Sequence, residues 1–266
     1  MRFARIQREG RPSYALLEGD TLHLLEGDIF GDYRRLDAAL PLADARLLAP
    51  VVPSKVLAAA VNYRSHVPGA RSVLKDESPP SIPQLFLKPP SSIIGPDEPI
   101  VLPAEARRVD LEGELVAVIG RKCRNVPPLA ALDYVFGYTC GNDVSARHWQ
   151  RDDIQWWRAK GADTFGPLGP LVATALDPSD LALRTRLNGE VVQETSTAAL
   201  IHGVAELVSF ASRWITLQPG DLVFTGTPGE TPSLTASDVV EVEIDGIGRL
   251  RNPVVGETRP GTRGAI

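Results

Sequence analysis

Two glutamates stand two residues apart in the segment 109–119 (VDLEGELVAVI), which otherwise has the apolar composition of a buried β-strand. Successive side chains of a strand point to opposite faces, so Glu112 and Glu114 share a face with Val116 and Val118. Two like charges on a largely apolar face are costly unless a positive group compensates them. Mg²⁺, Mn²⁺ and Ca²⁺ prefer oxygen ligands. The strand therefore predicts a divalent-metal site, and a wet strand face with two solvated glutamates is the alternative.

The composition excludes several classes of protein. The chain has 266 residues, of which 43% are hydrophobic, and its 28 basic and 33 acidic residues give a net charge of −5 without a strongly basic run. We therefore expect no nucleic-acid partner. The first residues lack the apolar core of a signal peptide, and apolar runs such as 56–61 are too short to cross a bilayer. Cys123 and Cys140 show no metal-binding or disulfide spacing, so we expect a soluble, cytoplasmic protein with no membrane partner.

Most apolar segments have the length and alternation of strands that are joined by turns. The predicted strands are 3–7, 14–17, 22–25, 56–61, 84–88, 100–102, 111–119, 135–143, 171–174, 181–187, 191–194, 239–244 and 248–250. The clearest helix is predicted over 197–214, with Ser196 or Thr197 as its N-cap. This pattern predicts an α+β, β-rich fold. Prolines near residue 50 divide it into a small N-terminal β domain, 1–52, and a larger domain, 53–266.

Residues 67–83 differ in composition from the predicted strands around them. They contain four prolines, a glycine and charges of both signs. Such a segment is typical of a loop or of a short helix that orders late, and lids over active sites are commonly built this way. We therefore expect 67–83 to be a mobile loop or a short helix, and the sequence does not determine whether it closes as a lid.

Six short motifs follow one another in a fixed order. They are Asn62-Tyr63-x-x-His66, Phe86-Leu87-Lys88-Pro89, Glu112-x-Glu114-Leu115, Gly141-Asn142-Asp143-x-Ser145-Ala146-Arg147, Lys160-x-x-Asp163-Thr164 and Thr225-Gly226-Thr227-Pro228. In this order they resemble the fumarylacetoacetate hydrolase family over residues 55–255, in particular its small bacterial-type isomerases and acylpyruvate hydrolases. The resemblance implies a mixed β-roll or barrel-like catalytic domain behind a small N-terminal domain, a homodimer, a bound Mg²⁺ or Mn²⁺, and 2-oxo or β-diketo acid substrates.

The same resemblance implies roles for the residues that match the motifs. Glu112, Glu114 and Asp143 match the metal ligands, for which Ca²⁺ is a third candidate ion. The remaining coordination positions would take water or the carboxylate and 2-oxo oxygens of a substrate, whose ketone the ion polarises. Lys160 matches a cation that neutralises the enolate or donates a proton. His66 matches the general base that activates water in hydrolytic members.

Four further positions match residues that contact substrate or line its pocket: Arg147, Gln150, Thr164 and Thr227. An ion pair with Asp152 or Asp153 is the alternative for the arginine. Gln150 and Thr164 would alternatively cap turns. A purely conformational role in a tight turn is the alternative for Thr227, and a solvated loop position is the alternative for Lys160.

The family pattern breaks next to the histidine. Small hydrolytic members typically carry a glutamate three residues after it, whereas this chain has Gly69 at that position. Asp76 or Glu77 would supply a carboxylate only if the segment 67–83 folds inward. The sequence therefore lacks the water-activating pair in its usual form.

This gap bears on which reaction the chain catalyses. Hydrolysis of a carbon–carbon bond needs an activated water, whereas decarboxylation or enol–keto isomerisation needs mainly the metal and an enolate-stabilising cation such as Lys160. We expect a metal-dependent enzyme of aromatic or related catabolism that acts on a small-molecule 2-oxo acid. Hydrolysis of an acylpyruvate- or fumarylpyruvate-type substrate is the nominal prediction. Decarboxylation or isomerisation of an oxaloacetate- or 2-hydroxymuconate-like acid is the first alternative, and a non-catalytic metal- or ligand-binding relative is the second.

Overall fold

A computed structural model describes residues 1–70 and 78–258 of the protein. Its strands are β1 (Arg2–Arg8), β2 (Arg11–Glu18), β3 (Thr21–Gly27), β4 (Tyr33–Pro41), β5 (Arg46–Leu47), β6 (Val56–Ala60), β7 (Gln84–Lys88), β8 (Ile93–Ile94), β9 (Ile100–Leu102), β10 (Val109–Asp110), β11 (Gly113–Ile119), β12 (Val135–Asn142), β13 (Ser145–Ala146), β14 (Gly166–Ala173), β15 (Ala182–Leu187), β16 (Glu190–Ser196), β17 (Leu222–Phe224), β18 (Val239–Ile244) and β19 (Gly248–Gly256). The α-helices are α1 (Arg147–Asp152), α2 (Trp157–Gly161) and α3 (Val204–Trp214). Short 3₁₀ segments are Leu42–Asp44, Arg64–Ala70, Pro90–Ser92, Pro128–Tyr134 and Thr197–Ala199. The prediction of a β-rich α+β fold is confirmed.

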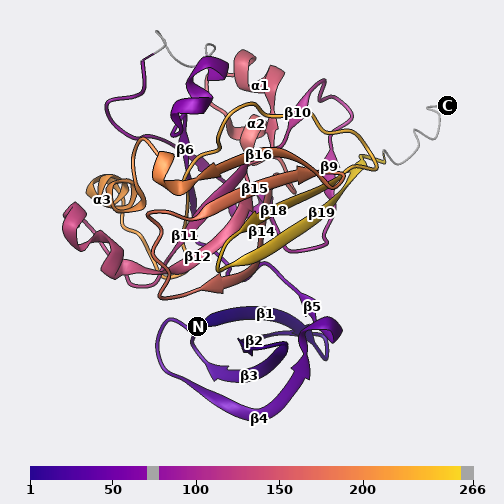
Figure 1. Ribbon diagram of the computed structural model, residues 1–266, viewed down its shortest axis with the longest axis vertical. Helices are drawn as coiled ribbons and strands as arrows, with labels where there is room; N and C mark the ends of the chain where they lie inside the picture. Colours follow the sequence, from indigo (N-terminus) through magenta and orange to yellow (C-terminus); the bar gives the residue numbers. More distant parts are fainter. Residues whose placement is uncertain (71–77, 259–266) are drawn as a thin grey trace, which may run out of the picture.

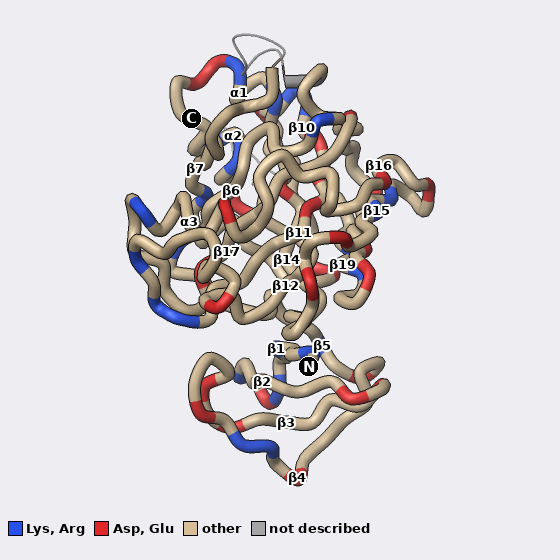
Figure 2. The backbone as a smooth tube through the Cα atoms, turned by 60° about the vertical axis from the view of Figure 1, so that its left-hand side comes forward, with Lys and Arg blue, Asp and Glu red and all other residues tan. Residues whose placement is uncertain are grey.

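One large sheet runs through the molecule in the order β4-β3-β2-β1-β14-β12-β11-β17-β6-β7. The N-terminal strands gather at the lower end of Figure 1, and β1 joins them to the rest by pairing antiparallel with β14. A second sheet has the order β16-β15-β18-β19-β9, and β10 pairs with β13 alone. Figure 2 shows acidic and basic positions interspersed over both parts of the fold.

The largest apolar core includes side chains from the inner strands of both sheets and from helix α3. Leu115 and Ala117 of β11 and Leu183 of β15 belong to it, together with Leu207 of α3. All residues of β11 are buried, as expected for a central strand that is covered on both faces. Gly141 of β12 must lack a side chain, because a Cβ there would come within 2.5 Å of the Phe224 and Val116 side chains.

The first two residues of the predicted strand 111–119, Leu111 and Glu112, lie outside regular strand pairing. Regular pairing runs through β10 and resumes at Gly113, so Glu112 lies between two strands. Its backbone N–H donates to the side-chain oxygen of Asn142 at 2.8 Å, and its carbonyl accepts from the N–H of Asp143 at 2.8 Å. The side-chain amide therefore replaces a ladder bond at this point.

The predicted helix 197–214 begins later than expected. The Ser196 hydroxyl accepts from the N–H of Ala198, so it caps only the 3₁₀ turn Thr197–Ala199. Helix α3 starts at Val204, immediately after Gly203. The strand β4 (Tyr33–Pro41) was not predicted, because its charged residues conceal the alternation of half-buried and exposed positions.

The structure leaves part of the predicted loop or short helix untested. Within 67–83, residues as far as Ala70 continue the 3₁₀ segment that begins at Arg64, and description resumes at Ser78. Asp76 and Glu77 lie outside the described residues. Among the helices that are described, none combines the length and the hydropathy that crossing a membrane requires.

Truncation of Leu115 to alanine tests the central role of β11. Leu115 is fully buried in the main core, so Leu115→Ala should lower the free energy of unfolding by about 2–5 kcal/mol. Denaturant midpoints at constant m-value measure this change. Leu129→Ala removes the same atoms at a fully exposed site and is the control. Equal stability of the two variants would contradict the placement of β11 at the centre.

Candidate active site

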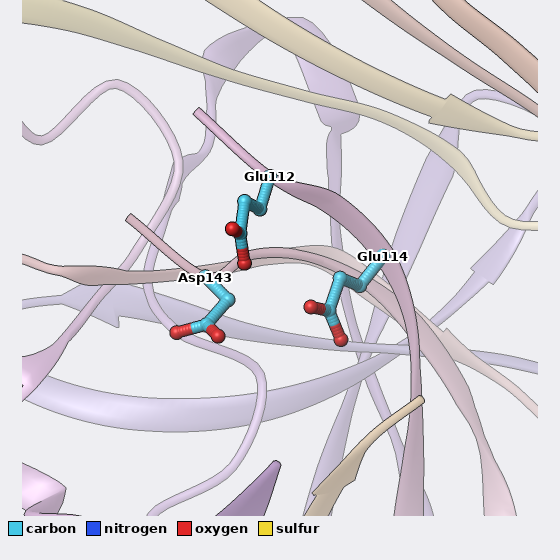
Figure 3. Close-up of side chains that lie close together, drawn as sticks. All are labelled: Glu112, Glu114 and Asp143. Carbon is cyan, nitrogen blue, oxygen red and sulfur yellow. The ribbon is translucent and has the colours of Figure 1, made fainter. Parts of the chain in front are cut away.

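Three carboxylates converge at the junction of β11 and β12. One oxygen from each of Glu112, Glu114 and Asp143 lies within 4.8 Å of the other two, and all three residues are buried. The strand register produces this arrangement, because Gly113 pairs with Asn142 and so brings their neighbours together. Figure 3 shows the three side chains pointing into a common space. Three buried carboxylates without sulfur or imidazole suit a hard divalent cation.

Two buried lysines balance these acids. The Lys160 ammonium donates to Glu112 Oε2 at 2.7 Å and to Asp143 Oδ2 at 2.6 Å. The Lys88 ammonium donates to the other oxygen of Asp143 at 2.6 Å, to the carbonyl of Phe165 at 3.0 Å and to the carbonyl of Lys160. Each carboxylate oxygen of Asp143 therefore faces an ammonium group.

The surroundings push the protonation of the two glutamates in opposite directions. Burial opposes the charged form of Glu112, but Lys160 and Arg147 outweigh burial and lower its pKa. Burial raises the pKa of Glu114 well above its usual range, and the charges of Asp143 and Glu112 raise it further. Its described hydrogen-bond donor is the N–H of Gly226 at 2.6 Å. Glu114 is therefore the acid that a bound cation would stabilise most in its charged form.

Arg147 contacts Glu112 and Asp110 rather than the carboxylates that follow it in sequence. Its guanidinium donates to Glu112 at 2.5 Å, to Asp110 at 2.7 Å and to Gln150 at 2.8 Å. Asp152 and Asp153 instead pair with Arg151 and Arg158. The alternative prediction, an ion pair of Arg147 with Asp152 or Asp153, is therefore wrong.

Sequence reasoning assigned no role to Lys88 or to Asp110. Asp110 is fully buried between the guanidinium groups of Arg108 and Arg147, with N···O distances of 2.7–3.0 Å. Both are charged residues within predicted apolar segments, which is the same signal that singled out the two glutamates. A charged residue within an apolar segment is predicted to be buried, but the segment does not show which distant residue pairs with it.

A cavity of about 670 Å³ opens over this site. Glu112, Lys160, Arg147, Gln150, His66 and Thr227 of the predicted site line it, together with Arg108, Asp110, Arg151, Glu230 and Thr231. Phe86 and Trp156 form part of its apolar wall, with ring centroids 5.2 Å apart. The remaining lining residues are Ala59, Ala60, Val61, Gly229 and Pro232. The cavity therefore combines a charged wall with an apolar one.

The two predicted threonines have structural partners. The hydroxyl of Thr164 accepts from the N–H of Val101 at 2.9 Å, and Thr164 is not among the described residues that line the cavity. Thr227 does line the cavity, but its hydroxyl also donates to the carbonyl of Gly113 and accepts from the Gln193 amide, both at 3.0 Å. The structure thus gives no support to Thr164 as a substrate contact.

His66 lines the cavity and contacts a backbone carbonyl. Its Nδ1 lies 2.6 Å from the carbonyl oxygen of Gly229. Within residues 1–70 and 78–258, the histidine–carboxylate pairs involve His23 and His202 and not His66. Asp76 and Glu77, the carboxylates that the sequence leaves as candidates beside His66, lie outside the described residues.

Comparison with known proteins matches most of the chain to one family. Residues 55–255 match the model described as "Fumarylacetoacetate (FAA) hydrolase C-terminal", and residues 1–50 match "Rv2993c-like, N-terminal". The fold is similar to the crystal structure of a 5-carboxymethyl-2-hydroxymuconate delta-isomerase from Mycobacterium smegmatis, with a TM-score of 0.88 and 46% sequence identity. The match covers 97% of this chain and 100% of the isomerase chain.

Two further relatives bear on metal and reaction. A maleylpyruvate hydrolase from Sphingobium sp. SYK-6, in complex with manganese(II) and pyruvate, has 30% identity, a TM-score of 0.80 and coverage of 97% of this chain and 100% of its own. A mitochondrial oxaloacetate tautomerase of Xenopus laevis, fahd2, is 41% identical over 81% of this chain and 70% of its own length.

Removal of one carboxylate should weaken metal binding. Glu114→Gln is expected to raise the Kd for Mn²⁺ by at least about tenfold, because even an outer-shell partner of a metal contributes that much. Calorimetric titration of the metal-depleted protein measures the change. Glu190→Gln, at an exposed position in β16, is the matched control. Unchanged Mn²⁺ affinity in Glu114→Gln would contradict the three-carboxylate site.

The charge balance predicts opposite effects of two carboxylate variants on the metal-free protein. Asp143→Asn leaves two buried ammonium groups without their shared partner and should destabilise the chain by about 3–5 kcal/mol. Glu114→Gln replaces the acid whose charged form burial and the charges of Asp143 and Glu112 already oppose, so it should leave stability unchanged or raise it. Denaturant unfolding in EDTA measures both. Equal losses in the two variants would refute this account of the site.

Proposed function

The chain belongs to the fumarylacetoacetate hydrolase family, and we propose that it is a divalent-metal-dependent isomerase that interconverts the enol and keto forms of a small 2-oxo dicarboxylic acid. The observation that carries the proposal is the set of charged groups at the cavity. Glu112 and Lys160 line it, Glu114 and Asp143 lie directly behind Glu112, and the ring of His66 contacts the carbonyl of Gly229. Isomerisation needs the carboxylates and Lys160 and does not need an activated water.

The ion proposed at Glu112, Glu114 and Asp143 is Mg²⁺ or Mn²⁺, and the manganese in the Sphingobium relative supports this choice. When bound, it would supply Lewis-acid chemistry that polarises the 2-oxo group. Lys160 uses two of its three N–H donors on Glu112 and Asp143, which leaves the third for a substrate oxygen. Its ammonium group would thereby stabilise negative charge on an enolate.

His66 is the proposed carrier of the proton between carbon and oxygen of the substrate. It lines the same cavity as Lys160, and neutral imidazole accepts and returns protons near neutral pH. Arg108, Arg147 and Arg151 line the cavity as well and favour a substrate with a second carboxylate. Gln150, which accepts from Arg147, is proposed to orient that guanidinium. The names of the isomerase and tautomerase relatives support the same reaction class.

Hydrolysis of an acylpyruvate-type substrate is the second candidate function. The presence of His66 at the cavity and the similarity to a maleylpyruvate hydrolase favour it. Decarboxylation of an oxaloacetate-like acid would use the same carboxylates and Lys160 as isomerisation. The three reactions differ in their products, so one substrate panel separates them.

We also propose that the protein works as a cytoplasmic homodimer. A second, more apolar groove of about 1020 Å³ lies beside the cavity and includes Leu87 of the edge strand β7 together with Ile154 and Trp157. These three side chains are exposed, at 60%, 103% and 70% respectively. A second copy of the chain would cover this apolar surface.

The isomerase proposal predicts that the protein, with Mg²⁺ or Mn²⁺, accelerates the loss of enol absorbance from freshly dissolved oxaloacetate. His66→Gln and Lys160→Met should each lower kcat by about 10²–10⁴-fold, as expected for loss of a proton-transfer or charge-stabilising group. His23→Gln is the matched control, because His23 lies in the N-terminal strand β3.

The outcomes of this panel are distinct. Release of pyruvate from acylpyruvates, lost in His66→Gln, would replace the proposal with hydrolysis. Evolution of CO₂ from oxaloacetate that survives His66→Gln would replace it with decarboxylation. Tight Mn²⁺ binding without turnover of any substrate would indicate a non-catalytic relative.

A further inference from the structure

The hydrogen bond between His66 and Gly229 determines which ring nitrogen carries the proton. A carbonyl oxygen can only accept a hydrogen bond, so at 2.6 Å the Nδ1 of His66 must be the donor. In the neutral ring this leaves Nε2 as the proton acceptor. The backbone N–H of His66 in turn donates to the carbonyl of Tyr63 at 3.0 Å, which holds the histidine on the first turn of the segment Arg64–Ala70.

The carbonyl of Gly229 belongs to a turn that a buried glutamine holds. Gln193 of β16 is 5% exposed, and its Nε2 lies 2.7 Å from the Pro228 carbonyl, 3.0 Å from Thr227 Oγ1 and 3.1 Å from the Glu230 carbonyl. These acceptors flank Gly229 on both sides. A single side-chain amide thus fixes the backbone that presents the carbonyl.

The same glutamine is tied to the metal site. Its Oε1 accepts from the N–H of Gly113 at 3.2 Å, and Gly113 stands between the two glutamates that are proposed as ligands. From the other side, the hydroxyl of Ser65 accepts from the N–H of Gly229 at 3.1 Å. The turn 227–230 is therefore fastened both to the strand that carries the carboxylates and to the segment that carries the histidine.

We propose that the Gly229 carbonyl, held by Gln193 and Ser65, orients His66 and fixes its neutral ring as the Nδ1–H tautomer, so that Nε2 exchanges protons with the substrate. Gln193 and Ser65 are positioning residues. The carbonyl does the orienting work of a carboxylate, but it carries no net charge. This role in proton transfer rests on the proposed isomerase function, whereas the tautomer does not.

The tautomer is measured directly by ¹⁵N NMR of the metal-free protein in EDTA, at about pH 8.5, where imidazoles are ordinarily neutral. The chain has four histidines, and loss of one signal set in His66→Gln assigns the ring. Nδ1–H is expected for His66. A predominant Nε2–H tautomer would overturn the proposal, and this result requires neither substrate nor metal.

Two variants test the positioning residues. Gln193→Met keeps the approximate shape but removes the amide; it should shift the His66 signals toward the Nε2–H tautomer and lower kcat by at least about tenfold with little change in KM. Ser65→Ala loses one exposed hydrogen bond and should lower kcat by about two- to fivefold. Ser65→Thr keeps the hydroxyl and should restore kcat. Gln84→Met, at an exposed position in β7, is the control.

These measurements separate this proposal from the proposed function. If Gln193→Met fails to fold, Ser65→Ala and Ser65→Thr decide the question. An unchanged tautomer and unchanged kcat in Ser65→Ala would overturn the positioning role. An Nδ1–H ring in a protein that hydrolyses acylpyruvates would support the orientation by Gly229 and refute isomerisation instead.

Discussion

The balance of buried charge is the constraint on which the rest of the site depends. Glu112, Glu114 and Asp143 lie close together and are almost fully buried, and such a cluster is unstable unless cations accompany it. Lys88 and Lys160 supply ammonium groups on both oxygens of Asp143, and Lys160 also reaches Glu112. The ammonium groups of the protein therefore hold Glu112 and Asp143 in place. Glu114 has no such ammonium partner among the described contacts, and a divalent ion bound there would replace the proton on its carboxyl group.

The fold meets this constraint by collecting charges from distant parts of the chain. Glu114 belongs to β11, Glu112 lies just before this strand, and Asp143 lies just after the neighbouring β12. Lys88 comes from the end of the edge strand β7, and Lys160 comes from the short helix α2. The Lys88 ammonium also binds the carbonyls of Lys160 and Phe165, so it fastens the end of α2 to the sheet. Lys88 thus contacts both the Asp143 carboxylate and the backbone of Lys160.

The orientation of His66, which also lines the cavity, depends on a backbone carbonyl. Within residues 1–70 and 78–258, the ring of His66 pairs with the carbonyl that the turn around Gly229 presents. A carbonyl orients an imidazole without adding a negative charge near Glu112. The proposed isomerase chemistry follows from this arrangement, since proton transfer to and from carbon requires an oriented ring but no activated water.

The sequence by itself determined the β-rich fold class, most strands and the pair Glu112 and Glu114, because apolar alternation and charges within apolar segments are local signals. Asp143, Lys160 and His66 were assigned instead from the order of the motifs that the chain shares with the family. Sequence reasoning failed where a contact joins residues far apart in the chain. The side-chain oxygen of Asn142 accepts the backbone N–H of Glu112 in place of a strand partner, and the hydroxyl of Thr164 accepts the backbone N–H of Val101. Lys88 and Gln193 likewise donate hydrogen bonds from their side chains to backbone carbonyls far away in the sequence, those of Lys160 and Pro228. Only the tertiary structure decided these contacts, because strand register and turn geometry bring their atoms together.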